Sequence, residues 1–338
     1  MHSPARLTRR KILGGAVATA VAASAGPAWA RQLQDHMPPG VTPKPKGPLV
    51  FLDFDQRELD ASYDQALWAP NQVAIATRNA QKSAATIARL GPPRRLAYGP
   101  TDIEKLDVYM TRRPNAPMHL FIHGGAWRFG RAADAAYMAE TFVDAGAHFI
   151  ALDFQSVVDA HGNLMTMADQ VRRAVAWVYR NAATFGGDPG RLYLSGASSG
   201  AHLASVALTT DWQKDFGLPS DLVKGGLCCS GPYDLYPVSL SARSSYITFS
   251  SEVVAALSSP RHLAWLGAPI VVAHGSLETP EFQRQSRDFA AAVKAAGKPV
   301  TLLIGEGYNH FEIHETQGNP YGLLGRAALA QMKLGPTV

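Results

Sequence analysis

The 338-residue sequence has little cysteine, few charged residues and no long apolar run beyond its N-terminal region. Its two cysteines, Cys228 and Cys229, are adjacent, which is awkward for a disulfide and too small a set for a multi-cysteine zinc site. No stretch after residue 30 approaches roughly eighteen apolar residues, so no membrane span is expected in the mature protein. Hydrophobic residues make up 46% of the chain, which excludes wholesale disorder. The length suits one large α/β domain or two small ones.

Acidic residues are absent from the first thirty positions, and this absence explains most of the net charge of +5. Arg6, Arg9, Arg10 and Lys11 are four of the 32 basic side chains, so the rest of the chain carries 28 basic against 27 acidic residues. The remaining charge is close to balanced. The sequence therefore predicts no nucleic-acid-binding surface.

Residues 1–30 have the pattern of an export signal. A basic start is followed by an apolar, Ala/Gly-rich stretch over 12–26 and by Ala28-Trp29-Ala30, an A-x-A cleavage pattern. The pair Arg9-Arg10 resembles a twin-arginine signal, which predicts a periplasmic or secreted protein; an uncleaved anchor is the alternative. Residues 31–47, rich in Pro and Lys, are predicted to be a flexible mature N-terminus, and 48–338 a single domain.

Short apolar segments alternate with helical patterns from about residue 94 onward. The predicted strands are residues 94–98, 106–110, 120–123, 149–154, 191–194, 226–230, 270–274 and 300–304. Alternating β and α units indicate a mostly parallel sheet with helices on both faces, and the short first connection indicates an antiparallel edge. Residues 51–92, without a clear strand, and the irregular residues 232–262 are expected to pack over the sheet or to form a small cap.

Two helices are predicted from apolar stripes. One stripe lies at positions i, i+4, i+7, i+8 and i+11 of a helix before the fifth strand, and it is made of Met167, Val171, Ala174, Val175 and Val178. A second stripe follows the seventh strand, made of Phe282, Phe289, Val293 and Ala296. Gly297 and Pro299 are expected to end that helix.

A serine lies where a sharp strand-to-helix turn is expected. Gly196-x-Ser198-x-Gly200 matches the G-x-S-x-G pattern after an apolar strand and before the helical run of residues 201–208. Small neighbours allow the close backbone approach such a turn needs, and the helix N-terminus places positive partial charge beside a developing oxyanion. Ser198 is the predicted nucleophile. Ser199 is the alternative, with its backbone N–H the expected oxyanion donor.

A second motif follows the third predicted strand. His123-Gly124-Gly125-Ala126-Trp127 is a turn whose backbone N–H groups can face a tetrahedral intermediate, so Gly124 and Gly125 are predicted to complete an oxyanion hole with Ser199. His123 precedes the nucleophile, whereas the general base of this arrangement comes last in the chain. His123 is therefore expected to hold the loop.

The general base and its acidic partner are sought after the later strands. His310 occupies a turn just after the last strand and is favoured over His314; a metal site at this i, i+4 pair lacks matching ligands. Glu278, four residues past the seventh strand, is the favoured acid. Two other carboxylates, Asp234 and Glu281, stay open as alternatives. His202, one helical turn from the nucleophile, is expected to be a packed core histidine.

These residues together resemble the α/β-hydrolase superfamily, and most closely its arylformamidase (kynurenine formamidase-like) and hormone-sensitive-lipase-like esterase branch. The resemblance covers most of residues 55–330 through segments 123–127, 196–203, 230–235, 278–286 and 309–311. It implies a Ser–acid–His triad with the acid at Glu278, where aspartate is common. Residues 198–202 depart from the family's usual S-A-G-G-H, and residues 153–158 lack its usual Tyr and Pro.

The sequence thus predicts a serine esterase for small aromatic or short-acyl esters, with Trp127, Tyr233, Tyr308 and Phe311 lining an apolar pocket. An arylformamidase acting on N-formylkynurenine is the first alternative, although export separates the protein from a cytoplasmic substrate. A non-catalytic binding module is the second. No dinucleotide or phosphate-binding glycine loop is present, so no cofactor is expected. The sequence leaves the oligomeric state open, a homodimer included.

Overall fold

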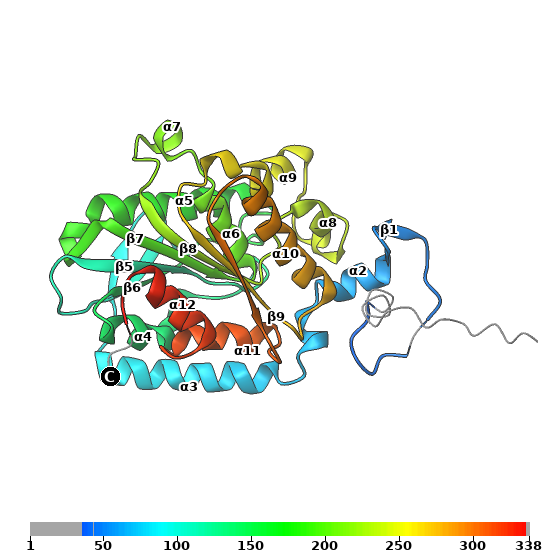
Figure 1. The fold of residues 1–338 in the computed structure, drawn as a ribbon, viewed down its shortest axis with the longest axis horizontal. Helices are drawn as coiled ribbons and strands as arrows, with labels where there is room; N and C mark the ends of the chain where they lie inside the picture. The colour runs from blue at the N-terminus through cyan, green and yellow to red at the C-terminus, as the bar shows by residue number, and fades with distance from the viewer. Residues whose placement is uncertain (1–35, 43, 336–338) are drawn as a thin grey trace, which may run out of the picture. The chain divides into compact units, whose positions relative to one another are not determined.

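The computed structural model describes residues 36–42 and 44–335 and contains an eight-stranded sheet between two layers of helices (Figure 1). Along the sheet the strands follow the order β10 (Val300–Gly305), β9 (Ile270–Gly275), β8 (Val223–Cys229), β7 (Gly187–Ala197), β5 (Ala116–Ile122), β6 (His148–Leu152), β4 (Lys105–Tyr109) and β3 (Arg94–Ala97). Within this sheet of the described residues, β3–β4 and β4–β6 pair antiparallel and the other neighbours pair parallel. All eight predicted strands are confirmed, as is the antiparallel edge.

The inner strands β5, β6 and β9 are buried along their whole length because alternate residues face separate cores. On β5, Met118, Leu120 and Ile122 belong to one hydrophobic cluster and Phe121 to the other. The first cluster lies under α5 (Leu164–Asn181), α6 (Ser199–Leu208) and α10 (Pro280–Ala295). On the other face, α4 (Ala139–Asp144), α11 (His310–Glu315) and α12 (Leu323–Gln331) lie over the second cluster, next to α3 (Gln72–Leu90) (Figure 1). The remaining helical elements are α2 (Gln56–Ser62), η1 (Gln65–Trp68), η2 (Ala132–Met138), η3 (Ala182–Phe185), α7 (Trp212–Phe216), α8 (Leu235–Ser239), η4 (Ala242–Ser245), α9 (Ser251–Leu257), η5 (Ser259–Arg261), η6 (Leu263–Trp265) and η7 (Thr316–Gly318).

The two predicted helical stripes are found in α5 and α10. All five stripe residues of α5 are buried, and Phe282, Phe289 and Val293 are buried in α10. Ala296 differs: it is the exposed C-cap of α10, because the helix ends one residue earlier. Gly297 follows with a φ of +70°, the left-handed conformation that glycine adopts at helix ends.

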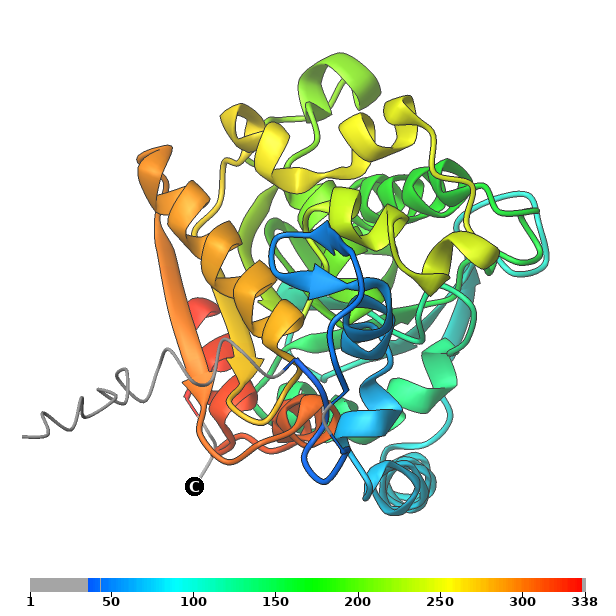
Figure 2. The same ribbon diagram turned by 90° about the vertical axis from the view of Figure 1, so that its right-hand side faces the viewer.

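The N-terminal segment contains a hairpin that the sequence did not reveal. Leu49–Phe51 (β1) and Phe54–Asp55 (β2) pair antiparallel, and strands of three and two residues are too short to show an alternating pattern. The hairpin and α2 lie against α10 and the 232–262 segment (Figure 2). In that segment the hydroxyl of Tyr246 donates to the Ala126 carbonyl, at 3.3 Å. These elements form the small cap that was predicted.

Residues 36–42 and 44–47 also contact the domain, where the composition favoured a flexible segment. The His36 ring stacks on Phe54 with 3.8 Å between centroids, and Lys46 Nζ lies 3.1 Å from the buried carboxylate of Glu58. The compact unit therefore begins at His36. The predicted signal, residues 1–30, lies outside the described residues. In the described part of the chain, no helix has the length and hydropathy needed to cross a membrane.

Candidate active site

Ser198 occupies the turn between β7 and α6 in a backbone conformation that few non-glycine residues adopt. Its φ is +56° and its ψ is −127°. The glycines on either side of Ser198 leave no room for a side chain, because neighbouring backbone atoms lie too close. A Cβ on Gly196 would lie 2.2 Å from the Gly200 carbonyl oxygen, and a Cβ on Gly200 would lie 2.1 Å from that of Ile122. The turn therefore presents Ser198, half-buried, at the first residue before a helix N-terminus.

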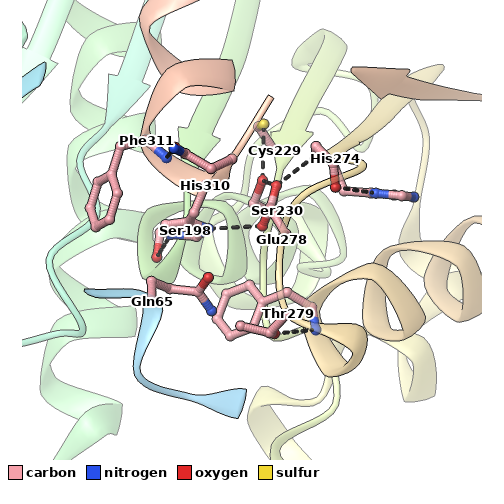
Figure 3. Close-up of polar contacts among 12 residues, drawn as sticks. Gln65, Ser198, Cys229, Ser230, His274, Glu278, Thr279, His310 and Phe311 are labelled. Carbon is pink, nitrogen blue, oxygen red and sulfur yellow. Dashed lines mark hydrogen bonds and ion pairs between the residues drawn. The ribbon is translucent and has the colours of Figure 1, made fainter. Parts of the chain in front are cut away.

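Three side chains predicted from distant parts of the sequence form one hydrogen-bonded row (Figure 3). His310 Nε2 lies 3.0 Å from Ser198 Oγ, and His310 Nδ1 lies 2.8 Å from Glu278 Oε2. His310 is the first residue of α11, whose N-cap Asn309 accepts hydrogen bonds from the amides of Phe311 and Glu312. That cap fixes the helix start and with it the imidazole.

Glu278 is fully buried in the turn between β9 and α10. Burial alone raises the pKa of a carboxyl group. The charge and hydrogen bond of His310, together with the Gly275 amide at 2.7 Å from Oε1, outweigh that effect and lower the pKa of Glu278 below its ordinary value. Glu278 is therefore an ionised partner for the imidazole at neutral pH.

The alternative residues have other partners. Asp234 caps α8 by accepting from the Tyr236 amide, and Glu281 accepts from the Arg284 guanidinium and the Tyr63 hydroxyl. Tyr63 follows α2, so this bond ties the N-terminal segment to α10. Neither carboxylate contacts a histidine among the described residues.

The other serine and histidines are also engaged elsewhere. His314 is half-buried with its ring 4.7 Å from that of His310, and desolvation lowers its pKa to about 3. Ser199 Oγ accepts from the Trp127 amide at 3.1 Å. His202 Nε2 donates to the Leu257 carbonyl at 2.8 Å, as expected for a core histidine.

The His123–Trp127 loop lies directly against the nucleophile turn. A Cβ on Gly124 would lie 2.7 Å from the Ala197 carbonyl oxygen and 3.0 Å from Ser198 Cβ, and Gly125 has a φ of +106°. His123 donates from Nδ1 to the Gly124 carbonyl at 2.8 Å and stacks on Phe154, so it holds the loop as predicted. Within residues 36–42 and 44–335, the amides of Gly124, Gly125 and Ser199 have no hydrogen-bond partner.

The four predicted pocket residues lie in different surroundings. Tyr308 is 37% exposed, and Phe311 packs edge-on against His310 with 5.3 Å between centroids. Trp127 is almost fully buried and lines a cavity of about 230 Å³ with His123 and Met167, among others. The assignment of Tyr233 to the pocket is wrong. Tyr233 is fully buried, stacks on Phe289 at 4.3 Å and donates its hydroxyl to the Cys228 carbonyl.

One buried hydrogen bond to Glu278 could not be predicted from the sequence. Ser230, the residue after β8, donates its hydroxyl to Glu278 Oε1 at 2.5 Å. The two residues are 48 positions apart and neither pattern nor spacing links them. In the described part of the chain, no three His, Cys, Asp or Glu side chains are arranged to hold a metal ion.

The chain resembles known hydrolases in both sequence and fold. A family model described as BD-FAE matches residues 106–225. Kynurenine formamidase from Danio rerio is 32% identical over 278 residues, covering 78% of this chain and 92% of that protein. Isoprenylcysteine alpha-carbonyl methylesterase from Arabidopsis thaliana is 26% identical over 243 residues, covering 65% and 56%.

Solved structures support the same fold. The esterase from Pyrobaculum calidifontis superposes with a TM-score of 0.62 at 17% identity, covering 80% of this chain and 95% of that one. A Silicibacter sp. TM1040 protein reaches a TM-score of 0.70 at 19% identity, covering 80% and 98%. Sequence relatives and fold agree, and the chain belongs to the arylformamidase and esterase branch of the α/β hydrolases, a family of carboxylic ester hydrolases and related amidases.

Proposed function

We propose that the protein is a serine esterase that cleaves small aromatic or short-acyl esters through an acyl-enzyme on Ser198. The observation that carries this proposal is the row Ser198–His310–Glu278, with contacts of 3.0 and 2.8 Å. Ser198, the proposed nucleophile, has the base His310 within hydrogen-bond distance, and the ionised Glu278 orients that base.

The geometry supports the following steps. Ser198 Oγ attacks the ester carbonyl carbon as its proton passes to His310 Nε2, and Glu278 stabilises the imidazolium that forms. The carbonyl oxygen becomes an oxyanion, which accepts hydrogen bonds from the backbone amides of Gly124, Gly125 and Ser199. The C–O bond to the leaving alcohol then breaks, and His310 returns the proton to the alkoxide. Water, deprotonated by His310, hydrolyses the acyl-enzyme by the same route.

The proposed preference for small substrates is based on the side chains next to Ser198, His310 and Glu278. The half-exposed ring of Tyr308 and the edge-on ring of Phe311 next to His310 provide apolar contacts for an aryl or short acyl group. Tyr246 of the cap donates to the Ala126 carbonyl in the loop beside Ser198, and we expect the cap to limit the length of an acyl chain. We therefore expect p-nitrophenyl acetate to be turned over faster than p-nitrophenyl palmitate. Equal or faster cleavage of the long chain would contradict this preference.

A second candidate function is hydrolysis of formamides such as N-formylkynurenine. It is favoured by the 32% identity to kynurenine formamidase across 78% of the chain. The same residues serve an amide, with His310 protonating the leaving nitrogen. The ratio of kcat/KM for N-formylkynurenine to that for p-nitrophenyl acetate separates the two. A ratio well below one supports the esterase, and a ratio well above one supports the formamidase.

We also propose export by the twin-arginine route, which carries folded proteins, to the periplasm or beyond. The proposal rests on the Arg9-Arg10 pair, the apolar stretch and the Ala28-Trp29-Ala30 pattern. Replacing both arginines with lysine should leave the protein in the cytoplasmic fraction. Cytoplasmic wild-type protein, or export unaffected by the double replacement, would contradict it.

A further inference from the structure

The Glu278 carboxylate has hydrogen-bond partners on two sides: His310 on one side, and Ser230 with the Gly275 amide on the other. Its Oε2 faces His310 Nδ1 at 2.8 Å, whereas its Oε1 accepts the Ser230 hydroxyl at 2.5 Å and the Gly275 amide at 2.7 Å (Figure 3). Ser230 and Glu278 are both fully buried. The carboxylate therefore bridges the end of β8 and the start of α11, with Oε1 facing Ser230 and Gly275 and Oε2 facing His310.

The backbone of Ser230 is fixed in the position this contact needs. Its φ is +58°, a left-handed conformation that a non-glycine residue adopts only when its surroundings impose it. Its amide donates to the Ala273 carbonyl of β9 at 2.8 Å. The strand pairing thus holds the hydroxyl against Glu278.

A third side chain orients the Ser230 hydroxyl. Cys229 Sγ lies 3.3 Å from Ser230 Oγ, and burial raises the pKa of this thiol well above its ordinary range. The thiol therefore keeps its proton and can donate to the serine oxygen. The serine hydroxyl donates in turn to Glu278, and Figure 3 shows the contacts from Cys229 through Ser230 to Glu278.

We propose that Ser230 is a positioning residue for the hydrolysis: its hydroxyl fixes the Glu278 carboxylate and favours its ionised form, so that Oε2 stays directed at His310. The inference rests on the proposed function, because it acts through Glu278 and His310. The glutamate side chain is long enough to contact Ser230 and His310 at the same time.

The test compares Ser230→Ala with Ser230→Gly. Both remove the hydroxyl, but glycine relieves the left-handed backbone and alanine does not, so their effects on stability differ while their effects on catalysis should agree. For both we expect kcat to fall roughly 10-fold with KM within about twofold of wild type. We also expect the acid limb of the kcat profile to move to higher pH, because a buried carboxylate that loses a donor is protonated more readily.

Ser286→Ala is the matched control. Ser286 is a fully buried serine of α10 whose hydroxyl has no partner among the described residues, so wild-type kinetics are expected. In a Glu278→Ala background, Ser230→Ala should cause no further loss of kcat. Wild-type kcat and acid limb in both Ser230 variants would overturn the inference, as would an equal loss without Glu278.

Labelling with a fluorophosphonate separates this inference from the proposed function. Wild-type protein that labels at Ser198 supports the proposed function, and unchanged Ser230 variants in that case contradict only the positioning role. Wild-type protein that does not label removes the proposed function and this inference with it.

Discussion

Ser195 and Ser198 each lie within hydrogen-bond distance of a histidine ring nitrogen, and comparing the two pairs shows what the candidate site adds. Ser195 Oγ lies 2.7 Å from His119 Nε2, and Ser198 Oγ lies 3.0 Å from His310 Nε2. Ser195 lies near the end of β7, and Ser198 lies three positions later in the turn that follows this strand. The distance between serine and histidine does not distinguish the two pairs.

The surroundings of each histidine differ. His119 stacks on Phe142 at 4.0 Å, has no partner for Nδ1 among the described residues, and its pKa is lowered by burial to about 3. His310 Nδ1 contacts the ionised Glu278. A general base becomes positively charged during the reaction, and only the second environment stabilises that charge.

The surroundings of each serine differ as well. Ser195 is fully buried within β7 and also accepts from Gln317 at 2.8 Å. Ser198 is half-buried in a strained turn beside the unpartnered amides of the Gly124–Gly125 loop. A substrate can reach the second serine and not the first. A serine–histidine contact alone therefore does not distinguish the proposed nucleophile, whereas the carboxylate behind His310, the strained turn and the nearby amides do.

The largest expected effect separates the two serines. Ser198→Ala should lower kcat on p-nitrophenyl acetate on the order of 10³-fold or more, because the members of a triad act as a unit. Ser195→Ala should keep kcat within about twofold while lowering the free energy of unfolding by about 1–3 kcal/mol, since His119 and Gln317 lose their shared partner. Steady-state kinetics and urea unfolding check both. A large kcat loss in Ser195→Ala would break the comparison.

The second prediction concerns Glu278, the carboxylate partner that His310 has and His119 does not have among the described residues. Glu278→Gln should lower kcat by about 10²- to 10³-fold, because the amide cannot stabilise the imidazolium. Asp234→Asn is the matched control, since asparagine can still cap α8 and activity should be retained. The reverse order of losses would assign the acid to Asp234.

A smaller effect is expected from Glu278→Asp, which keeps the charge and shortens the reach. Removing one methylene prevents the carboxylate from contacting both Ser230 and His310 without backbone movement. We expect a loss of kcat of about 10-fold, smaller than that of Glu278→Gln. Wild-type kcat in this variant would show that the length of the side chain does not matter here.

The smallest effect is on the pH dependence of stability. The unfolded chain binds a proton at His119 near pH 6.5, whereas the folded chain does so only near pH 3, so stability falls as the pH drops below 6.5. Glu278, with its pKa below the ordinary value, contributes little to this change above pH 5. His119→Gln should reduce the loss of unfolding free energy between pH 7 and pH 5 by about 2 kcal/mol. Equal losses by urea unfolding would contradict the buried, neutral state of His119.

The strands and the three residues of the row were predictable because their signals are local. The buried strands are continuous apolar runs, and the motifs at 123–127 and 196–200 each follow one of them. The β1–β2 hairpin was missed because its strands are too short for periodicity. Sequence position also favoured Glu278 over Asp234, because the α/β order places the acid after a late strand.

The remaining features depend on contacts between distant residues. Tyr233 lies beside a motif, but its burial is decided by Phe289, which stacks on it from α10. The bond from Ser230 to Glu278 depends on the parallel pairing of β8 with β9, which brings the ends of the two strands together. Neither contact has a pattern in the sequence that could have predicted it.

In the proposed mechanism Ser198, and not Ser195 three positions earlier, is the nucleophile that His310 activates. The most direct measurement is site mapping by tandem mass spectrometry after reaction with a fluorophosphonate. We predict one adduct per chain, on Ser198, formed rapidly in the wild-type protein and not formed in His310→Ala. An adduct on Ser195 or Ser199, or undiminished labelling of Ser198 in His310→Ala, would contradict the account.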